Sequence, residues 1–231
     1  MRKILVLILL TIFSGCSNKT EPVKNNDYSD TSSINTEVKK GGKEELKSAI
    51  VYLSRINNIE SSSNFSLDGE DEEQNTKDIG NTESIAYLIR DVTHSEMFTI
   101  VVKNPYPDNY NEHIEQARRE IDNNTLPALQ DTIENLRDFD VIYLGYPIWL
   151  GEMPSPVRTF LSDNDLSNKT IAPFITSGGT TSISNTIQMI TVYQPEAIVT
   201  DYFFRTTSQL SNVEPDIERW LKQINKDTKG Q

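Results

Sequence analysis

The sequence predicts an α/β fold in which helices cover both faces of a parallel β-sheet. After residue 47, apolar runs that suit strands alternate with helical segments five times, a pattern typical of parallel strands joined by helical crossovers. The run from Val141 to Leu144 has no polar alternation, which indicates a strand buried on both faces. We therefore expect a doubly wound, five-stranded parallel sheet.

The five expected strands are short runs rich in β-branched and aromatic residues. They span residues 48–53, 97–102, 140–144, 170–176 and 196–204. We expect a bulge at Pro173, because a proline inside a central strand cannot donate a ladder hydrogen bond.

Helical periodicity marks the segments between these strands. The helix that opens at Asn81 carries one apolar stripe, and the last helix has Pro215 in its first turn, where proline is tolerated. Other helical segments span 108–121, 131–137, 154–161 and 182–190. The stripe residues are Ile85, Ala86, Leu88, Ile89 and Val92 in the first helix and Ile217, Trp220, Leu221 and Ile224 in the last.

The amino terminus, residues 1–15, is typical of an export signal. Arg2 and Lys3 precede an apolar stretch that ends in small residues directly before Cys16, and the stretch is too short to span a bilayer as a helix. The segment 13–16, Phe-Ser-Gly-Cys, resembles the bacterial lipobox, which implies cleavage before Cys16 and lipid attachment to its sulfur. The alternative is a signal cut elsewhere, which leaves a free thiol. Cys16 is the only cysteine, so no intrachain disulfide can form.

The rest of the chain divides into a tether, one domain and a tail. Residues 16–43 are polar and without periodicity, which predicts a flexible tether. Residues 44–226 suit a single domain, with an insertion at 55–79, and 227–231 are expected to be a disordered tail. The lipid would anchor this domain outside the cytoplasm, on the outer face of the bacterial cell membrane.

The net charge of −12 disfavours binding of nucleic acid or anionic lipid and favours a partner protein with a basic face. An acidic run at 68–73 indicates a solvated loop, although a calcium site is conceivable there. His94 and His113 stand apart from any nucleophile or metal-binding spacing, so we expect both at the surface and predict no metal site.

Three loops at the carboxyl ends of strands are candidates for ligand binding, because parallel strands bring such loops to one edge. The first contains Ser54 and closes at Gly80-Asn81-Thr82. Unpaired N–H groups at a helix start, together with hydroxyls, suit a phosphate. The alternative is that Asn81 or Thr82 merely caps the helix.

The second loop presents Tyr146, Pro147, Ile148 and Trp149. Aromatics at a strand end suggest stacking on a planar heterocycle; alternatively, Tyr146 and Trp149 pack in the core. The third loop contains Ser177, Gly178 and Gly179, whose backbone amides would line the edge of a ring. Otherwise this loop is an ordinary strand-to-helix turn.

Together these segments resemble the flavodoxin family, and in particular the branch with Gly-Tyr-Pro-Ile-Trp followed by Met-Pro-x-Pro-Val. The resemblance spans nearly all of 48–224 and includes Gly-Asn-Thr at 80–82, Pro-Tyr-Pro-x-x-Tyr at 105–110 and Thr-Ser-Gly-Gly at 176–179. It implies the strand order 2-1-3-4-5 and FMN as cofactor. By position, it implies that Ser54, Asn81 and Thr82 bind the phosphate, that Trp149 stacks on the isoalloxazine, and that residues 177–179 border the ring.

Two departures from the flavodoxin pattern bear on function. The insertion at 55–79 interrupts the usually compact phosphate loop, and the loop at 177–179 lacks the second stacking tyrosine of many flavodoxins. One flavin face would then be open to a substrate or a partner.

The predicted function is an FMN-binding electron-transfer flavoprotein tethered to the membrane through its lipid alone. It would serve a redox partner protein or a small quinone-like acceptor. An acidic surface suits a one-electron carrier, since nearby carboxylates lower the potential of an anionic reduced flavin. Two alternatives remain. One is an NAD(P)H-dependent oxidoreductase acting on quinones or nitro compounds, and the other is a lipoprotein of the same fold that binds a partner without flavin.

Overall fold

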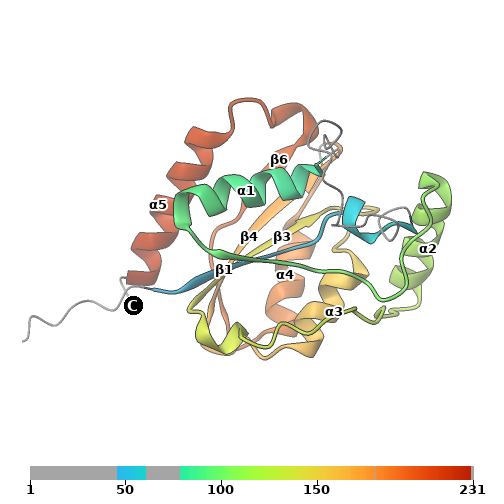
Figure 1. Cartoon of the computed structure of the whole chain (residues 1–231), viewed down its shortest axis with the longest axis horizontal. Coiled ribbons are helices and arrows are strands. Elements are labelled where there is room, and N and C mark those ends of the chain that lie inside the picture. The colour runs from blue at the N-terminus through green and yellow to red at the C-terminus, as the bar shows by residue number, and fades with distance from the viewer. Residues whose placement is uncertain (1–45, 61–78, 180, 230–231) are drawn as a thin grey trace, which may run out of the picture. The chain divides into compact units, whose positions relative to one another are not determined.

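The computed structural model describes residues 46–60, 79–179 and 181–229 (Figure 1). All of them belong to one compact unit, Glu44–Gln231. The predicted signal peptide, Cys16 and the predicted tether lie outside the described residues, as does most of the predicted insertion. Among the residues described, no helix is both long enough and apolar enough to cross a membrane.

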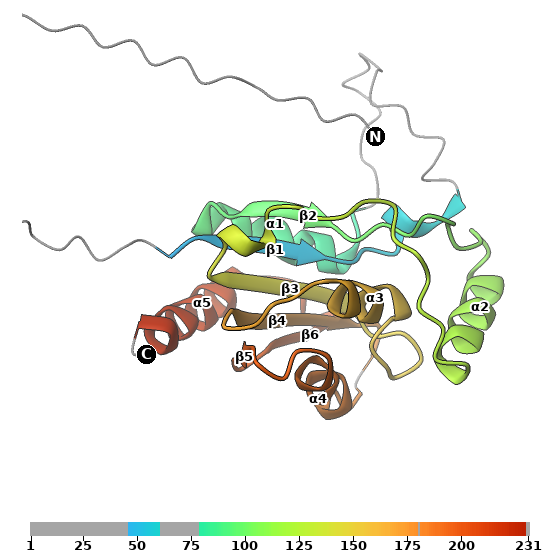
Figure 2. The same ribbon diagram turned by 90° about the horizontal axis from the view of Figure 1, so that it is seen from below.

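Parallel strands form a single sheet at the centre of this unit. Its strands are β1 (Ser48–Tyr52), β2 (Glu96–Thr99), β3 (Val141–Pro147), β4 (Thr170–Ser177), β5 (Ile198–Val199) and β6 (Phe203–Thr206). The order is β2-β1-β3-β4-β5, with β6 also paired to β4, and Figure 2 shows the strands in this order from top to bottom. The expected 2-1-3-4-5 order of a doubly wound sheet is confirmed.

The fifth strand is split into β5 and β6, and Pro173 explains where it breaks. Thr200 N donates to Ile171 O at 3.0 Å, and alternate residues of a strand bond to the same neighbour. Pro173, two residues after Ile171, therefore faces the same neighbouring strand but has no N–H group to donate to it. It lies opposite the gap between β5 and β6. The bulge expected in β4 is wrong, because β4 stays in register with β3 through this position.

Helices cover both faces of the sheet, as predicted. α1 (Asn81–Thr93) and α5 (Glu214–Lys229) lie above the strands in Figure 1, whereas α3 (Ser155–Asp163) and α4 (Ser184–Tyr193) lie below them. Side chains alternate between the two faces along each strand. Ala49 and Val51 thus join the core under α3 and α4, and Ile50 and Tyr52 join the core under α1 and α5.

One helix lies beyond the strands rather than over them. α2 (Tyr110–Asp122) begins where the Asn109 side chain accepts hydrogen bonds from two backbone N–H groups, a regular helix cap. Both views place α2 beyond the carboxyl ends of the strands. This position gives α2 access to the edge at which the three predicted loops meet.

Two local predictions differ from the structure. The segment 131–137 forms only a short 3-10 turn, Leu136–Asp138. The residues just before this segment pair with the chain beyond β2, since Leu129 forms an antiparallel bridge to Val102 and Gln130 N donates to Val101 O at 2.8 Å. α5 continues to Lys229, so part of the expected tail at 227–231 is helical.

Candidate functional site

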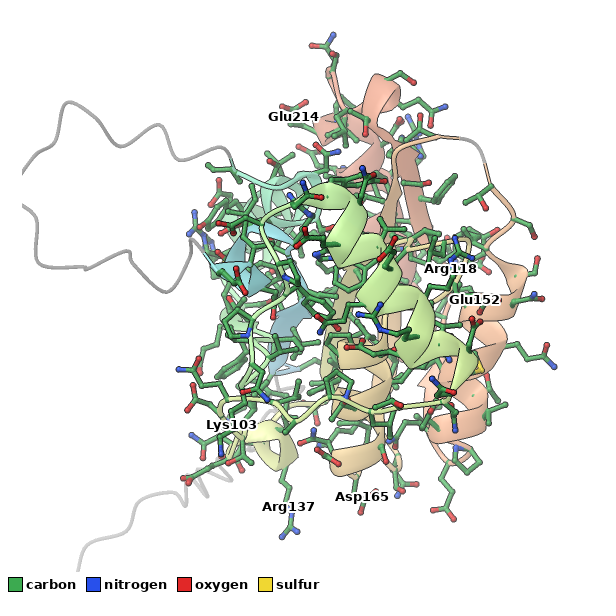
Figure 3. The ribbon with its side chains drawn as sticks, turned by 90° about the vertical axis from the view of Figure 1, so that its right-hand side faces the viewer. Lys103, Arg118, Arg137, Glu152, Asp165 and Glu214 are labelled. Carbon is green, nitrogen blue, oxygen red and sulfur yellow. The ribbon has the colours of Figure 1, made fainter. Side chains whose placement is uncertain are left out.

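A cleft of about 510 Å³ opens at the carboxyl ends of the strands. Figure 3 looks onto this end of the sheet, with α2 in the foreground. Nine of the residues predicted to bind a ligand line the cleft together: Ser54, Gly80, Asn81, Thr82, Pro147, Ile148, Trp149, Ser177 and Gly178. The three loops therefore meet at one site.

Two predicted residues are not part of the lining. Tyr146 is fully buried and its hydroxyl donates to Thr186 Oγ1 at 3.4 Å. The alternation of side chains along β3 turns it into the core beside α4, so the structure places the Tyr146 side chain in the core and not in the lining of the cleft. Gly179 is exposed, outside the lining, and its N–H donates to Ser177 Oγ at 3.3 Å.

The phosphate-type features lie where β1 ends and α1 begins. Ser54 is 1% exposed, and within the described part of the chain its Oγ has no hydrogen-bond partner. Gly80 precedes the first turn of α1, and a Cβ at residue 80 would stand 2.5 Å from Ser54 Oγ. Since the first N–H groups of a helix have no partner within the helix, a free hydroxyl and free amide donors share a cradle that only glycine leaves open.

A set of hydroxyl residues surrounds this cradle, and we call Ser54, Thr82, Thr176, Ser177 and Thr207 the hydroxyl cluster. The hydroxyls of Thr82 and Thr176 are 2.7 Å apart and buried. The Asn81 side chain donates to Thr207 Oγ1 at 2.9 Å, and this hydroxyl donates to Ser177 O at 3.3 Å. α1, β4 and the turn η4 (Thr207–Gln209) are thereby held together. Sequence reasoning missed Thr207, which no motif marks.

The loop after β3 is a tight turn with backbone strain. Trp149 and Glu152 exchange two backbone hydrogen bonds, of 3.1 and 2.9 Å. The two residues between them, Leu150 (φ 54°) and Gly151 (φ 82°), are both left-handed, as a two-residue turn of this hand requires. A left-handed leucine is strained, and Leu150 lines the cleft.

Arg158 of α3 holds this turn in place through contacts with Met153 and Glu152. Its Nε donates to Met153 O at 3.0 Å, and Nη2 lies 3.4 Å from Glu152 Oε2. The Arg158 side chain is only 7% exposed, so the ion pair is shielded from water on one side. These contacts fix the backbone that carries Trp149.

Trp149 lies in a buried set of rings that we call the aromatic cluster: Tyr106, His113 and Trp149. The indole centroid is 4.6 Å from the imidazole and 5.2 Å from the Tyr106 ring, both edge to face. Trp149 is 6% exposed and also lines the cleft. The two interpretations of Trp149, core packing and ligand contact, are therefore compatible.

The expectation that His113 lies at the surface is wrong, because its side chain is fully buried. His113, Ala117 and Glu120 form the buried face of α2, and this helical spacing was the signal in the sequence that could have placed it. Burial, reinforced by the charge of Arg55, lowers the pKa of His113 from 6.5 to about 4. Neither ring nitrogen has a hydrogen-bond partner among the residues that the structure describes.

Arg55 is the only charged side chain in the lining as far as the structure describes it. Its Nη2 donates to Asp108 O at 3.0 Å, and the guanidinium lies 5.9 Å from the centre of the Tyr110 ring. No carboxylate stands among these lining residues, although the whole chain carries a net charge of −12. The cleft is thus neutral to positive within an acidic protein.

A profile of the flavodoxin family matches residues 77–224, more than half of the chain. The chain belongs to the flavodoxin family.

Solved structures give the same fold. A protein described as a flavoprotein from Bacteroides eggerthii DSM 20697 superposes with a TM-score of 0.60 at 23% identity, covering 78% of this chain and 99% of that one. A flavoprotein from Lactobacillus acidophilus NCFM, crystallised in complex with FMN, gives 0.52 at 20% identity, covering 76% and 99%. No curated protein matches the chain.

In this member of the flavodoxin family, the start of the predicted insertion is part of the site. Asn58 is 1% exposed; its amide donates to Ser54 O and Ile100 O, each at 2.9 Å, and its oxygen accepts from Val102 N at 2.8 Å. These bonds tie the backbone of Ser54 to the chain beyond β2. The first residues of 55–79 therefore fix the phosphate-type cradle, whereas 61–78 lie outside the described residues.

Within the described part of the chain, no group of three His, Cys, Asp or Glu side chains could hold a metal ion. The described lining of the cleft offers hydroxyls, backbone amides, the Asn81 amide, aromatic rings, the His113 imidazole and one guanidinium.

Proposed function

We propose that this flavodoxin-family chain binds FMN in the cleft and functions as an electron-transfer flavoprotein. The observation that carries the proposal is the unpaired, buried Ser54 hydroxyl beside Gly80 and the start of α1. A buried hydroxyl without a partner is costly in a protein that binds nothing there, and a phosphate oxygen would accept its hydrogen bond. The FMN complex of the L. acidophilus protein, which has the same fold, supports the choice of ligand.

The residues of the cleft fit the two ends of FMN. Ser54, Asn81 and Thr82, with the first amides of α1, would hold the phosphate. Trp149 would contact the isoalloxazine, with Pro147 and Ile148 beside it, and Ser177 and Gly178 would border the ring. Bound FMN supplies reversible electron transfer, whereas the protein sets affinity, potential and access.

The exposed rim of the cleft supports a role in electron transfer. Tyr110 and Leu150 line the cleft and are 65% and 37% exposed, so a partner protein or a small quinone-like acceptor could approach its rim. Because the described lining holds no carboxylate, the cleft itself gives no reason to expect a strongly lowered flavin potential. The low potential inferred from the overall acidity would have to come from charges farther away, which salt screens.

Absorbance of the purified full chain tests the proposal. If the protein is purified with its flavin, we expect absorbance bands in the blue and near ultraviolet. If it is purified without flavin, we expect added FMN to bind, with a red shift of the FMN spectrum and quenching of its fluorescence. Reduction of the bound flavin by NADH or NADPH alone would move the protein to the class of NAD(P)H-dependent oxidoreductases. A colourless protein that takes up no FMN would instead favour a flavin-free binding lipoprotein.

We also propose that the chain is a lipoprotein, lipidated at Cys16 and held on the outer face of the cell membrane. The support is the export signal and the small residues before the only cysteine. Replacing Cys16 with serine in the producing bacterium should release the protein from the membrane fraction, detected by fractionation and mass spectrometry. Persistence of the variant in the membrane would contradict lipid anchoring.

A further inference from the structure

His113 is a buried polar side chain for which the described protein provides no hydrogen-bond partner. It lines the cleft, is fully buried, and leaves both ring nitrogens unpaired. A neutral imidazole has one N–H donor and one acceptor nitrogen. Each remains unpaired at a cost in stability, which an apolar residue would avoid.

The neighbours of His113 do not remove this cost. The Tyr106 hydroxyl is committed to Glu120 Oε2 at 2.6 Å, and Gln116 donates to the other oxygen of this carboxylate at 3.2 Å. Arg55 carries only donors and a positive charge, which opposes protonation of His113. Trp149 offers a single donor and meets His113 edge to face.

The other unpaired atoms lie in the same cleft. In the described part of the chain, the buried side-chain atoms without a partner are Ser54 Oγ, Arg55 Nε and the two nitrogens of His113. All three residues line the cleft. Native proteins pair nearly all of their buried polar groups, so this concentration points to a polar ligand that completes the hydrogen bonds of all three.

We propose that His113, as a neutral imidazole, binds the hydroxyls of the ribityl chain of FMN, between the phosphate held beside Ser54 and the ring beside Trp149. This inference rests on the proposed function. A sugar-alcohol hydroxyl both donates and accepts, which matches an imidazole that needs one acceptor and one donor. A phosphate only accepts and would leave the second nitrogen unpaired. Arg55 lies on the phosphate side, adjacent to Ser54 in the chain.

Flavin titrations of the full chain, freed of bound flavin, test this assignment with three ligands: FMN, riboflavin, which keeps the ribityl chain but lacks the phosphate, and lumiflavin, which has the same ring and neither of the two. His113→Phe keeps an aromatic ring in the cluster and removes both nitrogens. We expect it to weaken the binding of FMN and of riboflavin about tenfold, toward the low end for two lost hydrogen bonds, and to leave lumiflavin binding unchanged. His113→Gln, which restores a donor and an acceptor, should recover most of the FMN affinity.

The matched control is His94→Asn. It removes the other histidine of the chain at a left-handed position that asparagine tolerates, and it should bind all three flavins as the wild type does. Because His113→Phe removes unpaired buried nitrogens, the flavin-free variant should melt at the same temperature as the wild type or higher. This result would separate a ligand contact from a role in folding.

The outcomes that overturn the inference are distinct. Equal FMN affinity of the wild type and His113→Phe, a loss of affinity for FMN but not for riboflavin, or an equal loss for FMN and lumiflavin would each reject the ribityl assignment and leave the proposed function intact. A lowered melting temperature together with failure of His113→Gln to recover FMN affinity would assign His113 to packing. A wild-type chain that binds no flavin would reject the proposed function itself.

Discussion

The hydroxyl cluster and the aromatic cluster form parts of one cleft and are built in different ways. The hydroxyl cluster is mostly paired within the protein, through the contacts Thr82–Thr176 and Asn81–Thr207–Ser177. The aromatic cluster is held by ring packing, and the described residues give its histidine, His113, no hydrogen-bond partner. Folding alone therefore pairs the hydroxyls of the first cluster with the exception of Ser54 Oγ, whereas in the second cluster both nitrogens of His113 stay unpaired among the described residues.

This difference predicts that some substitutions in the cleft will affect mainly the stability of the fold and others mainly ligand binding. Changes that break ring packing should affect the folded state first, because the rings are buried. Changes at the unpaired atoms should affect the ligand first, because those atoms contribute nothing favourable to the empty protein. Four predictions, in order of decreasing effect, test the distinction.

Trp149→Ala should have the largest effect on stability. The indole is 6% exposed and packs on Tyr106 and His113, so its removal leaves a cavity and should cost about 3 kcal/mol. Urea unfolding of the flavin-free chain measures this loss. A loss below about 1 kcal/mol would mean that the aromatic cluster does not support the fold.

Gly80→Ala should act mainly on binding. The added methyl would stand 2.5 Å from Ser54 Oγ and would displace the hydroxyl proposed to contact the phosphate. We expect FMN binding to weaken by about 2 kcal/mol, the range for a hydrogen bond to a charged group. Gly179→Ala, where a Cβ meets nothing within 4 Å, is the matched control in fluorescence titrations. Equal affinities of the two variants would remove Ser54 from the phosphate site.

Stability of the flavin-free chain should fall as the pH is lowered from 6.5 to 4. His113 has a folded-state pKa of about 4, against 6.5 ordinarily, so the unfolded chain takes up its proton first. The charge facing His113 is Arg55, and Tyr106 is held to Glu120. The loss should be on the order of 1–2 kcal/mol, allowing for screening by water in the cleft.

His113→Phe isolates this contribution. Thermal melts of both proteins at several pH values should show a smaller decline for the variant across this window. Identical pH profiles would mean that other groups, such as the many carboxylates, account for the whole dependence.

Leu150→Gly should have the smallest effect and the opposite sign. Leucine at φ 54° is strained, and glycine adopts this conformation without strain. We expect a gain of about 0.5–1 kcal/mol in the free energy of unfolding, because the side chain is already 37% exposed and little burial is lost. If the variant is instead destabilised, Leu150 contributes more by packing than its backbone strain costs.

The sequence predicted the features that depend on short, contiguous patterns. The alternation of apolar runs and helical segments gave the parallel sheet, and Gly80-Asn81-Thr82 correctly marked the start of α1. Pro173 signalled a disturbance, although the sequence alone placed it in β4 and not in the neighbouring strand, where the missing N–H takes effect. The residues of one strand do not by themselves show which strand lies beside it.

By itself, then, the sequence determined the fold and the three loops of the cleft, because periodicity and turn residues act over a few neighbouring positions. Only the tertiary structure decided that Tyr146 is core, that Thr207 joins the hydroxyl cluster, and that His113 is buried without a partner. The burial of this histidine and its lack of a hydrogen bond depend on residues outside its own helix, here Tyr106 and Trp149, which packing brings to its side. That is why the histidine, in isolation a surface residue, becomes a candidate ligand contact in the folded chain.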